Sequence, residues 1–227
     1  MPQSDTLDGA RLERRLPALL SVIAGMVDVI GFLSLGLFTA HVTGNLVVIA
    51  ALVARGGPPH LSQILSVPIF IAAVAATWLI AKALRRRGRA VLRPLLLIQF
   101  LLLASVLILA LTTDSATDPH GAMACVTALI AVSAMACQLS VLRLAVTGAP
   151  STVVMTTNVT NSVLALLDTL SRTQPLTEGA NERLKSTVNV IVGFFVGCVA
   201  GAAALSLLGD WAWSLPVVLA AAAVALR

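Results

Sequence analysis

The sequence predicts an all-α integral membrane protein, a polytopic bundle of transmembrane helices. Of its 227 residues, 58% are hydrophobic and only 11% are charged, and the mean hydropathy is +0.97. Soluble domains carry roughly 25% charged residues, so most of this chain requires a solvent other than water. Disorder is excluded as well, because disordered chains combine low hydrophobicity with high net charge. The lipid bilayer is therefore the first expected partner.

Apolar segments of two lengths divide the chain. A helix needs about 20 apolar residues to cross a bilayer core. Two segments, residues 43–53 and 160–170, are too short, since each reaches only ~16 Å as a helix. The six longer segments, each expected to cross as one helix, comprise residues 16–38, 64–84, 95–111, 122–146, 188–208 and 211–226.

Residues 1–15 are polar and end in a basic cluster before the first apolar segment. A signal peptide begins in the same way, but here the apolar run continues past Asp28 to Phe38 without a small-residue cleavage site. We therefore expect residues 1–15 to form a cytoplasmic tail and residues 16–227 to form a single membrane domain.

The distribution of basic residues predicts the topology, because cytoplasmic loops of membrane proteins carry an excess of lysine and arginine. If the two short segments are re-entrant and six helices cross, fourteen of the 15 Lys and Arg residues lie on the side of the N-terminus and only Arg55 lies outside. If all eight segments cross, the split falls to eight against seven. Six crossings are favoured, with both termini in the cytoplasm.

The two halves of the chain, residues 16–113 and 121–227, show the same order of long, short, long and long segments. An offset of 117 lays residues 42–46 over residues 159–163. Each half then contributes three crossings, so the second half is inverted relative to the first. Inverted 3+3 repeats with paired discontinuous helices are a transporter architecture.

Asp28 is the only acidic residue well inside a predicted crossing. A carboxylate at that depth costs about 2.5–3.5 kcal/mol on insertion scales, so it must face a polar partner or a cavity. One interpretation is a proton or cation site, or an anchor for the start of a half-helix. The alternative is a structural hydrogen bond to a neighbouring helix.

Polar residues gather at the starts of both short segments. Thr43 and Thr160 occupy the expected N-cap positions, where a hydroxyl accepts a bond from an unpaired backbone amide. Capping does not explain the neighbouring small and polar residues, one of which, His41, titrates near physiological pH when unperturbed. We therefore expect a substrate or ion path at the two helix starts, with a purely structural role as the alternative. Besides the two threonines, the candidate residues are Asp28, His41, Gly44, Asn45, Asn158 and Asn161.

Two further features have alternative interpretations. Gln138 lies in the fourth crossing at a depth comparable to that of Asp28, and it is a candidate neutral counterpart in the same site. Gly193, Gly197 and Gly201 recur every fourth residue and share one helix face. Such faces let helices approach closely, so we expect packing within the protein, with a homodimer contact as the alternative.

Other functional classes find no support in the sequence. Metal-ligand spacings, phosphate-binding glycine loops and hydrolase motifs are absent, so we expect no enzyme, no cofactor and no metal site. The net charge of +5 does not indicate nucleic-acid binding, because the basic residues lie between apolar segments and tyrosine is absent. The three cysteines lie in apolar segments and are expected to be small buried residues.

Residues 24–33 have the sequence A-G-M-V-D-V-I-G-F-L, and residues 41–46 have the sequence H-V-T-G-N-L. These motifs resemble the YoaK-like family of small bacterial membrane proteins, a domain of unknown function. The similarity covers roughly residues 16–226, and the A-G-x-x-D-x-x-G-F and T-G-N patterns carry it. The second half departs from the family, because Asn161 and Ser162 replace the last two positions of its T-G-T pattern. The resemblance implies the inner membrane of a bacterium and implies no substrate.

We therefore expect a membrane transporter or channel for a small solute or ion, with its site at the two half-helix starts near the bilayer midplane. Asp28 and His41 favour a proton-coupled carrier, whereas paired half-helices also suit a passive pore. The alternative from another class is a non-transporting membrane protein that binds or assembles with a partner.

Overall fold

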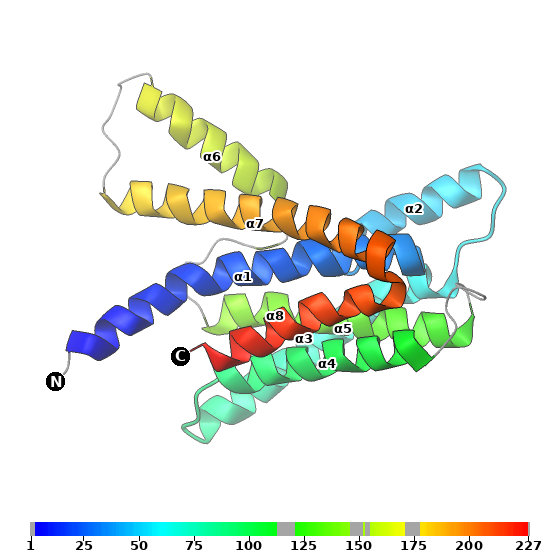
Figure 1. Cartoon of the computed structure of the whole chain (residues 1–227), viewed down its shortest axis with the longest axis horizontal. Helices are drawn as coiled ribbons and strands as arrows, with labels where there is room; N and C mark the ends of the chain where they lie inside the picture. The colour runs from blue at the N-terminus through cyan, green and yellow to red at the C-terminus, as the bar shows by residue number, and fades with distance from the viewer. Residues whose placement is uncertain (1–2, 113–120, 146–151, 153–154, 171–177, 227) are drawn as a thin grey trace.

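The computed structural model describes residues 3–112, 121–145, 152, 155–170 and 178–226, and within these ranges the protein is helical, with no strand (Figure 1). The predicted all-α class is therefore confirmed. The elements in chain order are α1 (Gln3–Leu35), α2 (Val42–Ala54), α3 (Leu61–Arg86), α4 (Leu92–Thr112), α5 (Ala122–Ala145), α6 (Met155–Leu170), α7 (Glu178–Leu208), the 3₁₀ helix η1 (Gly209–Trp213) and α8 (Ser214–Ala225).

Among the residues that the structure describes, five helical stretches are long and apolar enough to cross a membrane, as a multi-pass membrane protein requires. The fifth, Leu184–Ala225, combines most of α7 with η1 and α8. Gly209 begins η1 with a φ of 57°, and the chain reverses there, so that α7 and α8 run in opposite directions (Figure 1). The other four stretches are Leu16–Leu35, Leu61–Arg86, Leu92–Thr112 and Ala122–Ala145.

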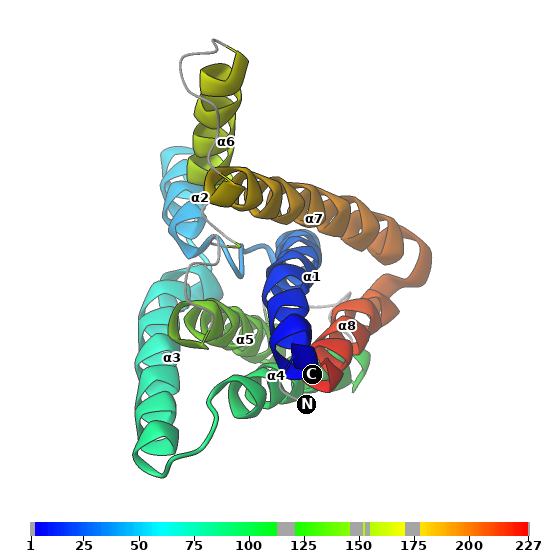
Figure 2. The same ribbon diagram turned by 90° about the vertical axis from the view of Figure 1, so that its left-hand side faces the viewer.

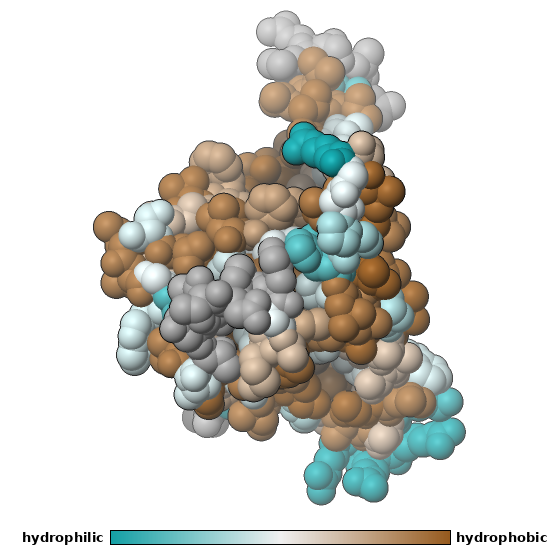
Figure 3. All heavy atoms as spheres, turned by 90° about the vertical axis from the view of Figure 1, so that its right-hand side faces the viewer, coloured by the Kyte–Doolittle hydropathy of each residue, from teal (hydrophilic) through white to brown (hydrophobic). Residues whose placement is uncertain are grey.

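α1 and α5 form the centre of the bundle (Figure 2). α1 packs against α5, α7 and α8, while α5 also packs against α3 and α4. Leu20 and Ile23 of α1 and Met135 of α5 are fully buried, whereas Phe195 and Leu207 on the outer helix α7 are 68% and 82% exposed. Exposed large hydrophobic side chains occur on all of the long outer helices, as expected for a protein whose outside contacts lipid, and hydrophobic residues also predominate on the end of the molecule that Figure 3 shows.

Glycines allow α1 and α7 to approach closely. A Cβ atom added to Gly197 would lie 2.2 Å from the Val22 carbonyl oxygen, and one added to Gly25 of α1 would lie equally close to the α7 backbone. Gly193 and Gly201 face the same stretch of α1. Packing within the protein therefore accounts for the glycine face of α7. A second copy of the chain would reach these three glycines only if α1 moved away.

The two short helices differ in how closely they follow their predicted segments. α2 begins and ends within one residue of the predicted range 43–53, whereas α6 begins at Met155, five residues before the predicted start. The expected N-caps are wrong. Thr43 lies within the first turn of α2, two residues after His41, which is the N-cap. Thr160 lies inside α6, where its hydroxyl donates to the Thr156 carbonyl over 2.9 Å.

α2 and α6 lie on the same side of the bundle, packed against α3 and α7 respectively (Figures 1 and 2). In Figure 1, each helix begins towards the middle of the long axis, and α2 then runs to the right while α6 runs to the left. Both chain termini and the turn between α3 and α4 lie towards the left end, and the turn between α2 and α3 lies at the right end.

Candidate functional site at the break between α1 and α2

The chain breaks between α1 and α2 and folds back on itself. Gly36 ends α1 in a left-handed conformation, with a φ of 71°. The backbone amides of Thr39 and Ala40 then donate to Asp28 Oδ1 over 2.7 and 2.8 Å. Asp28 lies seven residues before the end of α1, which is about 10 Å along the helix axis. The non-helical backbone therefore returns to the depth of Asp28 before α2 begins.

The Asp28 carboxylate is the centre of this break. The Thr39 hydroxyl also donates to Oδ1 at 3.3 Å, and Nδ1 of His41 lies 2.6 Å from Oδ2. Asp28 is only 4% exposed, and a buried carboxylate requires donors around it. Here the donors come from the chain segment that directly follows α1. The geometry thus makes Asp28 an anchor for the start of α2, which is one of the roles that the sequence suggests.

His41 connects the break to α7. Its ring packs edge-on against the ring of Phe194, with 5.3 Å between the centroids. The His41 side chain is 33% exposed, compared with 6% for the side chain of Asp28. The pair therefore joins a buried carboxylate to an ionisable ring that reaches the molecular surface.

Asn45 holds the break from the other side. Its Oδ1 accepts from the Phe38 amide and its Nδ2 donates to the Phe38 carbonyl, both over 2.8 Å. Nδ2 also donates to Ser66 Oγ on α3 over 3.0 Å. Gln63, one turn before Ser66, donates its Nε2 to the Gly36 carbonyl over 2.9 Å. The fully buried Asn45 thus replaces the backbone partners that Phe38 would have in a helix.

Two glycines make room for this arrangement. A Cβ atom at Gly31 would lie 2.7 Å from Thr39 Cγ2, so a side chain there would push the break away from α1. A Cβ atom at Gly44 would lie 3.0 Å from Cδ2 of Phe38, whose ring stacks on Phe32 with centroids 4.5 Å apart. Close approach, and not backbone conformation, therefore favours glycine at both positions, more strongly at Gly31 than at Gly44.

The residues of the A-G-x-x-D-x-x-G-F and T-G-N motifs thus build one local structure, in which a carboxylate and an amide hold a chain reversal. A family model described as "Protein of unknown function (DUF1275)" matches residues 16–226. The chain belongs to the DUF1275 family. This match confirms the resemblance to a family of unknown function that these motifs indicate. No curated protein and no solved structure matches the chain.

α6 of this DUF1275 protein carries a buried asparagine at the same helix position as Asn45 of α2. Asn45 and Asn158 are each the fourth residue of their helix, and both are buried, at 0% and 6% exposure. Aligned by their first residues, the two helices differ by 113 positions, whereas the sequence motifs predict an offset of 117. Two threonines precede Asn158, while Thr160 and Asn161 are exposed further along α6.

Gln138 belongs to a different polar group. Its Nε2 donates to the Leu20 carbonyl over 2.8 Å, and its Oε1 accepts from Gln99 Nε2 over 2.6 Å. Leu20 lies eight residues before Asp28, which is about 12 Å along α1. The structure therefore does not place Gln138 in the Asp28 network, although the side chains of Asp28, Gln99 and Gln138 are all buried in the bundle.

Thr39, Gln63, Ser66 and Gln99 also belong to these polar networks, and the sequence patterns alone do not predict their roles. A signal for two of them exists, since Gln63 and Ser66 are polar residues one turn apart at the start of an apolar segment. Thr39 lies close to the polar residues that gather at the start of the first short segment. Gln99 is a lone amide in an apolar helix, and only the fold brings it to Gln138.

Proposed function

We propose that this DUF1275 protein passes a small solute or ion across the inner membrane of a bacterium, along a path between the starts of α2 and α6. The observation that carries the proposal is the non-helical backbone of residues 36–41 at the depth of Asp28. Within a bilayer such backbone is stable only when protein buries it or it lines a water-filled cavity. Discontinuous helices of this kind form the midplane sites of transporters.

The proposed topology has six crossings, formed by α1, α3, α4, α5, α7 and α8, with α2 and α6 entering halfway from opposite faces. The basic cluster in and around the α3–α4 turn supports it, because this turn lies towards the same end of the molecule as both termini (Figure 1). Arg55 lies in the α2–α3 turn at the other end. The positive-inside rule then assigns both termini to the cytoplasm. Three crossings in each half give the inverted 3+3 repeat, with Asn158 as the counterpart of Asn45.

The candidate residues divide into those that shape the path and those that line it. Asp28, Gly44, Asn45 and Asn158 are assigned to shaping, since they are buried or closely packed at the helix starts. Lining is assigned to the exposed polar residues Thr43, Thr160 and Asn161. His41 is the residue through which protons would couple to transport, because its ring reaches the surface while it contacts Asp28.

Cysteine labelling tests the topology in a variant whose native cysteines, Cys125, Cys137 and Cys198, are replaced by alanine. Ser34→Cys at the end of α1 and Arg55→Cys after α2 should both react with a membrane-impermeant reagent added outside. Arg89→Cys, in the α3–α4 turn, should react only from the cytoplasmic face and serves as the matched control. Reaction of the Ser34 and Arg55 positions from opposite faces would show that α2 crosses the membrane. This result would contradict the inverted 3+3 repeat.

Flux in proteoliposomes tests the transport function. With a pH-sensitive dye inside and a potassium diffusion potential across the membrane, we expect proton entry to exceed that of protein-free liposomes. His41→Gln should slow this entry, whereas Thr112→Val, which changes an exposed residue at the end of α4, should not. If protons enter equally fast with and without the protein, the hypothesis of proton-coupled transport is disproved. If small inorganic anions and cations also fail to pass, transport itself is disproved.

A second candidate function is that of a non-transporting membrane protein that binds a partner. The observation that favours it is that the Asp28 and Asn45 side chains bond to the chain's own backbone. α6 would then offer its exposed apolar side chains, such as Val159 and Leu164, to that partner. A heterologous protein that copurifies stably, with Asp28→Asn and Asn45→Ala variants that keep their function in cells, would favour this candidate over transport.

A further inference from the structure

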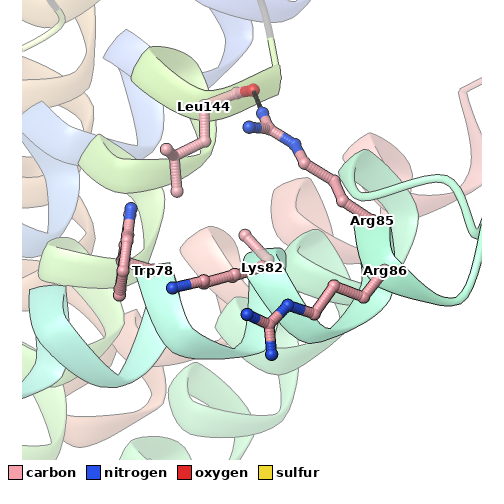
Figure 4. A pocket seen from close by; sticks show the side chains of 6 residues that line it. Trp78, Lys82, Arg85, Arg86 and Leu144 are labelled. Carbon is pink, nitrogen blue, oxygen red and sulfur yellow. Dashed lines mark hydrogen bonds between the residues drawn. The ribbon is translucent and has the colours of Figure 1, made fainter.

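A basic pocket, shown in Figure 4, lies beside the C-terminal end of α3. Gln63, which contacts the α1–α2 break, lies at the other end of this helix. Its volume is about 420 Å³, and its lining comprises Trp78, Ala81, Lys82, Arg85, Arg86 and Leu144. The five residues from α3 recur at helical spacings of three and four, so they share one face of that helix. Leu144 comes from the last turn of α5. The pocket therefore opens between two helices at one end of the bundle.

The cations of this pocket are not neutralised by the part of the chain that the structure describes. Lys82 Nζ lies 4.7 Å from the centroid of the Trp78 ring, and the Arg85 guanidinium donates to the Leu144 carbonyl. No described carboxylate pairs with Lys82, Arg85 or Arg86. Figure 4 shows the Lys82 and Arg86 side chains extending in the same direction from α3, while Arg85 reaches across to α5. Three like charges within two helical turns repel one another, so an anion between them stabilises the pocket.

We propose that this pocket binds the phosphate group of an anionic phospholipid. A guanidinium binds phosphate oxygens through paired N–H donors, and the lysine adds a compact charge beside them. Trp78 is the type of aromatic residue that lies at the level of lipid headgroups. Basic pockets between transmembrane helices on the cytoplasmic side are suited to such headgroups.

The surface next to the pocket favours a lipid over a soluble phosphate. Ile71, Trp78 and Leu79 of α3 are 62%, 47% and 58% exposed. These apolar side chains lie between the three cations and the opposite end of α3, on the part of the helix that faces the bilayer interior. A phospholipid whose phosphate contacts the cations would lay its acyl chains along this surface, whereas a soluble anion would leave it uncovered.

Positive charge at this end of the protein also orients the chain in the membrane, and that role needs no pocket. Arg89 and Arg93 belong to the same basic cluster but are not among the lining residues. Removal of these two charges therefore provides a control that matches the removal of Lys82 and Arg86 in charge and in position along the chain.

Quenching of Trp78 fluorescence tests the proposal on the full-length protein in phosphatidylcholine vesicles. The vesicles contain a small fraction of phosphatidylglycerol with brominated acyl chains or, in parallel, equally brominated phosphatidylcholine. A Trp78→Phe variant retains only Trp211 and Trp213, which lie in η1. Subtraction of its emission from that of the wild-type protein gives the Trp78 signal. We expect the phosphatidylglycerol to quench Trp78 more strongly. Lys82→Gln/Arg86→Gln should weaken this preference by up to about 30-fold, at about fivefold per cation.

The control variant Arg89→Gln/Arg93→Gln should keep the preference, and an equal loss in both double variants would overturn the proposal in favour of diffuse charge. Equal quenching by the two lipids in the wild-type protein would overturn it as well. If inorganic phosphate relieves the quenching as effectively as unlabelled phosphatidylglycerol, the site is one for a soluble anion and the lipid assignment fails. Native mass spectrometry of the wild-type protein adds a test without substitutions, in which phosphatidylglycerol should be retained in preference to phosphatidylcholine.

Discussion

Replacement of Asp28 by alanine is expected to destabilise the folded protein by about 3 kcal/mol or more. The substitution leaves the buried amides of Thr39 and Ala40 without their acceptor, and an unpaired buried amide costs about 1–3 kcal/mol. It also removes the partner of His41 Nδ1. The midpoint of unfolding in detergent, followed by far-ultraviolet circular dichroism, measures the effect.

Two other substitutions test whether the acceptor is the cause. Asp28→Asn keeps one oxygen for the two backbone amides, so it should recover most of the lost stability. Thr43→Ala changes an exposed hydroxyl at the same helix start and should stay within about 0.5 kcal/mol of the wild-type protein. An alanine variant as stable as the wild type would show that the break between α1 and α2 does not depend on the carboxylate.

Replacement of Gly197 by alanine is expected to be one of the two most disruptive glycine-to-alanine changes among the described residues, together with Gly25→Ala. The new Cβ atom would lie 2.2 Å from the Val22 carbonyl oxygen, and this backbone atom cannot yield unless α1 and α7 separate. Overpacking of a well-packed core typically costs about 1–3 kcal/mol. The loss should lower the unfolding midpoint, and Gly197→Leu should lower it further.

Helix propensity alone predicts the opposite sign, because alanine is a better helix former than glycine by about 1 kcal/mol. Ala203→Val adds carbon atoms to an exposed position of the same helix and should leave the midpoint nearly unchanged. If Gly197→Ala raises the midpoint instead, the close contact between α1 and α7 is disproved.

The sequence predicted the helical class and the position of the break because both depend on local composition. Apolar segment lengths and the polar stretch around His41 located α2 to within one residue. The start of α6 was misplaced because Thr156, Thr157 and Asn158 resemble a polar loop, although they form the first turn of a helix. A helix start among polar residues depends on tertiary packing, which here buries Asn158, and local composition does not contain that information.

For the candidate site, the sequence identified the residues better than their roles. Asp28, His41 and Asn45 do lie around one chain reversal, as their types and spacing indicated. Ser66, which accepts from Asn45, and Gln63, which donates to the Gly36 carbonyl, lie on α3, and a pairing across more than twenty residues leaves no trace in a single sequence. Gln138 illustrates the same limit, since equal depth in the membrane does not determine which neighbour a side chain faces.

The packing of α6 determines how the native state opens. Within the described residues, α6 contacts chiefly one neighbour, α7, and α2 chiefly contacts α3, to which the Asn45–Ser66 bond also ties it, whereas α1 and α5 are enclosed by several helices. A helix held on one side separates at a lower free energy than one in the centre of a bundle. Sub-global opening therefore begins with release of α6 while the remaining helices stay together. Amide protons in the buried parts of α5 and of residues 16–35 of α1 are expected to exchange with solvent only when the whole bundle comes apart.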